Sequence, residues 1–86
     1  MLPARERAVL YLRAGIPPDS AGELSVEGKE GQIISYADLY ARTEGALGGA
    51  SAAAIAATLG FTRQRIDQFH AHAIEIVKGA LGQRGS

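Results

Sequence analysis

The chain contains no cysteine and no tryptophan, and none of its apolar runs is long. Without cysteine it cannot form a disulfide, use a thiolate as a nucleophile or bind zinc through sulfur. No segment approaches the roughly 18 consecutive apolar residues that a membrane-spanning helix requires. The first residues place an acid among the bases and do not resemble a signal peptide. We therefore expect a cytoplasmic protein with no membrane partner.

An excess of charge is also missing, because nine Lys and Arg residues balance nine Asp and Glu residues. Many DNA-binding domains are basic overall, so the neutral net charge counts against DNA binding by this chain. The charges are nevertheless unevenly distributed. Arg63 and Arg65 lie together late in the chain, whereas Glu23, Glu27 and Glu30 gather in an earlier segment. The sequence therefore allows a focused basic face on a neutral protein.

A length of 86 residues suits one small domain, and a hydrophobic content of 47% is enough to build a core. We interpret residues 1–82 as a single domain and residues 83–86 as a flexible tail. A domain of this size buries little surface, and dimerisation is a common way to bury more. We therefore expect a homodimer, with the candidate contact residues Tyr11, Leu12, Ile16, Ile76 and Leu81.

The spacing of apolar residues predicts a mainly α domain of about four helices. Pro3 suits a first helical turn, and Gly15 suits the position just after a helix ends. Ser35 and Ser51 are placed to cap two later helices. The expected helices cover residues 3–14, 36–43, 52–59 and a long final stretch from the cap Thr62 to about Leu81.

The segment between the first two expected helices allows two interpretations. Pro17 and Pro18 cannot continue the first helix. Beyond them, Leu24 and Val26 alternate with polar residues, and a turn signal rich in glycine follows at residues 28–31. The pattern indicates either a short β-hairpin packed on the helices or an irregular loop.

Residues 52–71 match the pattern of a helix-turn-helix. Two closely crossing helices need a small residue at the crossing, which Ala56 provides, and the turn needs a residue that tolerates positive φ, which Gly60 provides. Thr62 is placed to cap the second helix. The apolar residues that would hold both helices on the domain are Ile55, Leu59, Phe61, Ile66 and Phe69. Each feature alone is common, but their shared register makes the pattern specific.

If Ile66 and Phe69 face the core, the other face of the last helix carries polar residues suited to DNA. Arginine pairs with guanine and glutamine with adenine through paired hydrogen bonds in the major groove. We therefore expect base contacts from Arg63, Gln64 and Gln68 and phosphate contacts from Arg65 and Thr62. Asp67 would accept a hydrogen bond from cytosine or repel phosphate. The full candidate DNA-binding set is Thr62, Arg63, Gln64, Arg65, Asp67, Gln68 and Ala71.

Two blocks of the sequence resemble region four of bacterial primary sigma factors. LPARERAVLYLR at residues 2–13 is similar to the opening helix of that region, and AAIAATLGFTRQRIDQ at residues 53–68 is similar to its helix-turn-helix. The segment between the blocks is far longer than the family's connection, and the other sigma regions are absent. The second block also resembles plasmid-borne repressors of the TrfB/KorA type. These resemblances imply major-groove binding by the last helix and a homodimeric transcriptional repressor of bacterial, phage or plasmid origin.

A competing interpretation treats the same two helices as an ordinary αα-hairpin with a solvated polar face. The domain would then be a protein-interaction module on a helix-turn-helix scaffold, contacting RNA polymerase or another transcription protein. The neutral net charge favours this alternative.

No group of residues resembles an active site. His70 and His72 are about 200° apart around a helix, so they cannot bind one metal ion together. The glycines near residue 48 are not followed by the Gly-Lys-Ser/Thr of a phosphate-binding loop. We therefore expect no enzymatic activity, no metal and no cofactor.

Overall fold

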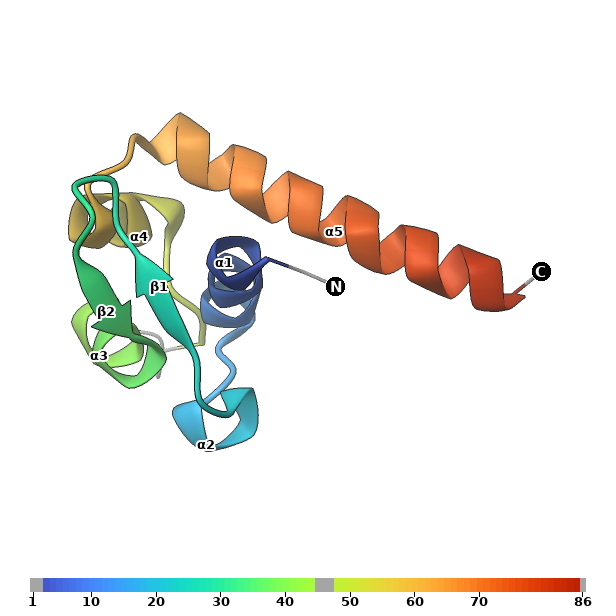
Figure 1. The fold of residues 1–86 in the computed structure, drawn as a ribbon, viewed down its shortest axis with the longest axis horizontal. Coiled ribbons are helices and arrows are strands. Elements are labelled where there is room, and N and C mark those ends of the chain that lie inside the picture. The colour runs from blue at the N-terminus through green and yellow to red at the C-terminus, as the bar shows by residue number, and fades with distance from the viewer. Residues whose placement is uncertain (1–2, 45–47, 86) are drawn as a thin grey trace.

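The computed structural model describes the backbone of residues 3–44 and 48–85, and the side chains of those residues up to residue 79. This part of the chain folds into helices and one two-stranded sheet, as Figure 1 shows. The elements in chain order are α1 (Ala4–Ala14), α2 (Pro18–Ala21), β1 (Ser25–Glu27), β2 (Ile33–Ser35), α3 (Tyr36–Arg42), α4 (Ala52–Leu59) and α5 (Arg63–Gly85). The predicted mainly helical class is therefore confirmed.

Helix α1 ends against the segment that leads into α4. Gly15 follows α1 with φ 73°, a left-handed conformation that glycine adopts without strain. The backbone N–H of Ala50 donates to the carbonyl oxygen of Leu12 at 2.7 Å. Gly49 permits this close approach, because its φ is +118° and a Cβ there would lie 2.4 Å from the Arg13 carbonyl oxygen. A glycine is therefore required where the two segments meet.

The segment after α1 contains one helical turn, α2, that the sequence analysis did not predict. Pro17 and Pro18 do prevent α1 from continuing. Pro18 also begins α2, because its fixed φ and missing N–H suit the first position of a helix. The backbone N–H groups of Ser20 and Ala21 donate to the Pro17 carbonyl oxygen at 3.0 and 3.1 Å. The two prolines therefore end one helix and start another.

Strands β1 and β2 form an antiparallel hairpin in which Val26 lies opposite Ile34. Both of these side chains are buried, whereas Ile33 on the outer face is 68% exposed. The hairpin interpretation is therefore confirmed over the irregular loop. Strand β2 leads directly into α3, and the hydroxyl of Ser35 caps that helix by accepting a hydrogen bond from the Asp38 N–H at 3.3 Å.

Three tyrosines pack together where α1, α2 and α3 meet. Tyr36 is 1% exposed, and its ring centroid lies 6.2 Å from those of Tyr11 and Tyr40. The Tyr36 hydroxyl donates to the Ile16 carbonyl oxygen at 2.6 Å. Burial raises the pKa of Tyr36 to about 12, with smaller contributions from Tyr40 and Tyr11. The Tyr36 hydroxyl therefore stays protonated to a higher pH than the hydroxyl of an ordinary tyrosine.

One core joins α1, the hairpin, α3, α4 and the first half of α5. Its buried members are Ala8, Val9, Leu12, Val26, Ile34, Tyr36, Leu39, Ala50, Ala52, Ile55, Ala56, Leu59, Ile66 and Phe69. The interpretation of Leu12 as a dimer contact is wrong, because α1 turns this side chain fully into the core. Leu81, another residue suggested for the dimer, lies outside the described side chains.

Helix α5 extends past the rest of the molecule, as Figure 1 shows. It runs to Gly85, beyond the predicted end near Leu81, and includes residues 83–85 of the segment interpreted as a tail. Its first half buries Ile66, Phe69 and Ala73, whereas Val77 in its second half is 37% exposed. The helix is therefore anchored by its N-terminal half.

Candidate nucleic-acid interface

Three residues, Gly60, Phe61 and Thr62, connect α4 to α5. Gly60 has φ +82°, and the N–H groups of Gly60 and Phe61 both donate to the Ala56 carbonyl oxygen, at 2.8 and 3.0 Å. At the start of α5, the Thr62 hydroxyl accepts a hydrogen bond from the Arg65 N–H at 3.1 Å. The predicted roles of Gly60 as the turn residue and Thr62 as the helix cap are confirmed.

The apolar face shared by α4 and α5 fixes the rotation of α5 about its axis. Ile55, Leu59 and Ile66 have no exposed surface, and the small Ala56 is also buried. Helix α5 packs against both α4 and α1. Because these contacts hold one face of α5 against the core, they also determine which of its residues face solvent.

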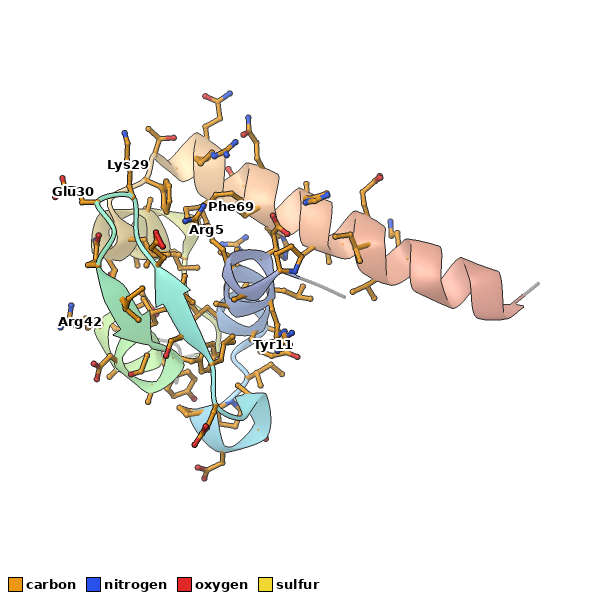
Figure 2. All side chains as sticks on the ribbon, viewed as in Figure 1. Arg5, Tyr11, Lys29, Glu30, Arg42 and Phe69 are labelled. Atoms are coloured by element: carbon orange, nitrogen blue, oxygen red, sulfur yellow. The ribbon has the colours of Figure 1, made fainter. Side chains whose placement is uncertain are left out.

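Arg5 of α1 lies beside two aromatic rings of this unit. Phe61 and Phe69 meet edge to face with their ring centroids 5.4 Å apart. The Arg5 Cζ lies 4.9 Å from the Phe61 centroid and 5.5 Å from the Phe69 centroid, within the range of a cation–π interaction. Its Nε and Nη2 donate to the Glu27 carbonyl oxygen at 3.3 and 3.1 Å. Arg5 therefore joins α1, the hairpin and the α4–α5 unit, and Figure 2 shows it next to Phe69.

Every residue of the candidate DNA-binding set is exposed. Arg63, Gln64, Asp67, Gln68 and Ala71 share one face of α5, because their spacing repeats with the helical turn. Thr62 and Arg65 flank this face at the beginning of the helix. The structure thus brings five of the seven sequence-predicted residues together on the accessible face opposite the buried face of α5, with Thr62 and Arg65 beside it.

Arg65 makes contacts that its sequence position alone did not predict. Its Cζ lies 4.8 Å from the centroid of the Phe69 ring, and its Nη1 donates to Gln68 Oε1 at 3.1 Å. A carbonyl oxygen has two lone pairs, so Gln68 Oε1 retains one for another donor, and the amide nitrogen keeps its own hydrogens. Arg65 therefore orients Gln68 while leaving it able to bind a base edge.

The hairpin tip, residues 28–31, lies against the end of α4. The Lys29 N–H donates to the Leu59 carbonyl oxygen at 3.0 Å, and a Cβ placed on Gly60 would lie 3.7 Å from the Lys29 Cβ. Figure 2 shows Lys29 and Glu30 at this tip, near the beginning of α5. The hairpin therefore brings Lys29 and Glu30 to the end of the molecule where α4 meets the turn into α5.

A histidine and a carboxylate link α5 to α1 at another point. His72 Nδ1 lies 3.3 Å from Glu6 Oε1, a pair that the sequence did not predict because the two residues are far apart in the chain. The second oxygen of Glu6, Oε2, is buried and makes no hydrogen bond within the described residues. No three His, Cys, Asp or Glu side chains gather into a metal-binding group among the residues that the structure describes. The pair is therefore best interpreted as a contact between helices.

Among residues 3–44 and 48–85, no helix combines the length and the apolar character needed to cross a bilayer. Comparisons with models of known protein families, with curated proteins and with solved structures found no match for this chain. The basis for assigning a function is therefore the geometry of the α4–α5 unit together with the residues on its exposed face.

Proposed function

We propose that the chain binds double-stranded DNA sequence-specifically, with the first turns of α5 in the major groove. The observation that carries this proposal is the shared exposure of Arg63, Gln64 and Gln68 on one face of a helix whose other face is buried. These residue types match the hydrogen-bonding edges of guanine and adenine in the major groove. A helix about 10–12 Å wide also fits a groove about 12 Å wide.

The remaining members of the set have supporting roles in this proposal. Thr62 and Arg65 lie at the start of α5, where hydroxyl, backbone N–H and guanidinium groups suit phosphate oxygens. Asp67 accepts a hydrogen bond from a cytosine amino group, or it excludes sequences that bring phosphate too close. Ala71 is small enough to let the helix approach the base edges. Base reading therefore rests on three residues and positioning on the others.

The proposal includes homodimerisation and transcriptional repression in a bacterium, on a phage or on a plasmid. One short recognition helix makes few base contacts, and binding at two half-sites multiplies affinity. The part of α5 beyond the body offers the partly exposed Ile76 and the exposed Val77 as candidate dimer contacts. Tyr11 and Ile16, which are partly buried, remain candidates from the body of the domain.

A protein-interaction module that contacts RNA polymerase is the second candidate function. The observation that favours it is the net charge of zero, which is unusual for a protein that binds a polyanion. In that case the polar face of α5 is an ordinary solvated or protein-binding surface. DNA binding that weakens steeply with salt would exclude this alternative as the main function.

Selection of bound sequences from random duplex DNA tests the proposal directly. We expect a recurrent sequence with two related half-sites about 34–36 Å apart or a multiple of that distance, as two-fold helix-turn-helix dimers require. Fluorescence anisotropy on the selected duplex would then show affinity falling steeply as salt rises. The absence of binding to any DNA at low salt would overturn the proposal.

Replacement of one arginine separates base reading from general attraction. Arg63→Ala is expected to cost about 1–3 kcal/mol of binding free energy and to relax the preference at one base pair. Arg42→Ala is the matched control, because Arg42 is exposed on α3 and Figure 2 shows it pointing away from α5. Equal losses from the two variants, with base preference intact, would place the interface elsewhere.

A further inference from the structure

The hairpin tip is built to hold a fixed position beside the recognition helix. Within the tip, the Gly28 N–H donates to the Gln32 carbonyl oxygen at 2.8 Å and the Gly31 N–H to the Gly28 carbonyl oxygen at 3.1 Å. The Glu30 N–H donates to Gln32 Oε1 at 3.1 Å. These bonds satisfy backbone groups that a flexible loop would leave to water. The tip is therefore an ordered turn.

Two contacts attach this turn to the helix-turn-helix. The Lys29 N–H donates to the carbonyl oxygen of Leu59, the last residue of α4, at 3.0 Å. The end of β1 is held from the other side, because Arg5 donates to the Glu27 carbonyl oxygen while its guanidinium lies against the Phe61 ring. The side chain of Lys29 is exposed. The backbone that carries this lysine is thus held at a fixed place at the turn that leads into α5.

The dimensions of DNA indicate what this cation would meet. A helix with its side chains is about 10–12 Å wide, and the major groove is about 12 Å wide. A helix in the groove therefore nearly fills it, and an element packed on the turn that leads into that helix faces the sugar–phosphate strand at the groove's edge. Lysine is a compact charge on a long stem, which suits phosphate better than the paired geometry of base edges.

From these observations we infer that the hairpin tip is a second DNA-contacting element, in which Lys29 binds a backbone phosphate beside the groove that α5 enters. This inference rests on the proposed DNA-binding function. The neighbouring Glu30 is also exposed and faces the same polyanion, so it weakens binding. The tip therefore carries two side chains with opposite effects on affinity, and neither reads a base.

Two substitutions that each change the charge by one unit test the inference. Lys29→Gln is expected to weaken binding about three- to tenfold on specific and non-specific DNA alike. It should also reduce the steepness of the salt dependence by about 0.9 in the slope of log K against log salt. Glu30→Gln is expected to tighten binding about two- to fivefold, again without changing base preference. Arg42→Gln and Glu23→Gln are the matched controls, because both residues are exposed and lie outside α5 and the hairpin tip.

The possible outcomes separate this inference from the function on which it rests. If the unmodified protein binds no DNA at low salt, the proposed function fails. If it binds and Arg63→Ala changes base preference, but Lys29→Gln matches Arg42→Gln and Glu30→Gln matches Glu23→Gln, only the inference is overturned. Urea unfolding of each variant shows whether Lys29→Gln loses affinity by unfolding. A gain of affinity in Glu30→Gln cannot arise in that way, so it supports the inference independently.

Discussion

The aromatic residues of the molecule form two clusters with different surroundings. Phe61 and Phe69 meet edge to face beside the guanidinium groups of Arg5 and Arg65, at the α4–α5 unit. The tyrosine cluster, Tyr11, Tyr36 and Tyr40, instead surrounds a buried hydroxyl that donates to a backbone carbonyl oxygen. Both clusters contact α1, which contributes Arg5 to one and Tyr11 to the other. The first cluster is held by cations and the second by a hydroxyl that must remain neutral.

The difference shows how one small core serves two purposes. Cations over aromatic rings keep positive charge at the surface proposed to meet DNA, and the contact does not depend on a titration near neutral pH. The tyrosine cluster loses part of its stabilisation when the Tyr36 hydroxyl is deprotonated. We therefore expect the two clusters to respond differently to truncation, to alkali and to the loss of charge.

The largest effect is expected from Phe69→Ala. Phe69 is 6% exposed, and truncating a buried phenylalanine typically costs about 3–5 kcal/mol of unfolding free energy. Because Phe69 also carries Arg65 on its ring, residual DNA binding should fall as well. Urea unfolding followed by circular dichroism measures the change. Phe69→Leu, which keeps much of the apolar volume, should cost clearly less, and equal losses would contradict the packing role.

Tyr36→Phe tests the other cluster through pH. The folded pKa of about 12 lies above the unfolded value of 10, so the folded state keeps a proton that the unfolded chain has released. The resulting stability is fully present below pH 10 and is lost as pH rises toward 12. The native protein should lose about 2–3 kcal/mol across this interval that the variant does not lose. Parallel pH profiles in urea titrations would refute this expectation.

Arg5→Met tests whether the charge of Arg5 stabilises the packing of Phe61 and Phe69. Methionine preserves a long apolar side chain but removes the charge and the hydrogen bonds to the Glu27 carbonyl oxygen. The expected cost is about 1–2 kcal/mol, from the cation–π contact of a partly buried side chain and from two solvent-exposed hydrogen bonds. Arg13→Met, at an exposed position of the same helix, should change stability by less than about 0.5 kcal/mol. If the two variants are equally stable, the cluster is held by apolar contact alone.

The smallest effect is expected outside both clusters, at Gly79 of α5. A Cβ added there meets nothing within 4 Å, and its φ does not require glycine. Gly79→Ala should therefore raise the unfolding free energy by up to about 0.5–1 kcal/mol, because alanine favours the helix. No change would indicate that this part of α5 frays before the core unfolds, which hydrogen exchange would reveal.

The α4–α5 unit was predictable because its signals are local. The serine before α4, the glycine of the turn and the threonine before α5 each act within a few residues of themselves. The apolar spacing of Ile66 and Phe69 then fixes the outward face of α5. Capping and periodicity are read from neighbours in sequence, so the elements and the exposed set followed from them.

Contacts between distant segments were not predictable in the same way. The pairing of His72 with Glu6 and the place of Arg5 beside Phe61 depend on how α1 packs against α5. The hairpin was one of two open interpretations, because three-residue strands carry little pattern of their own. The position of its tip beside Gly60 follows only from the folded arrangement. Sequence patterns therefore defined α4, α5 and the exposed face of α5 but not the elements packed beside them.

The hydrogen bond from Lys29 to the end of α4 has a consequence for attempts to isolate the α4–α5 unit as a peptide. An excised peptide of residues 51–79 would lose the donor to the Leu59 carbonyl oxygen and the Arg5 guanidinium beside Phe61 and Phe69. Short isolated helices are marginal in water, so such a peptide should show little helical circular dichroism. Transplanting α4 and α5 into another protein would therefore require carrying α1 and the hairpin with them. We therefore expect the whole domain to be the smallest part of this molecule that folds after transfer to another protein.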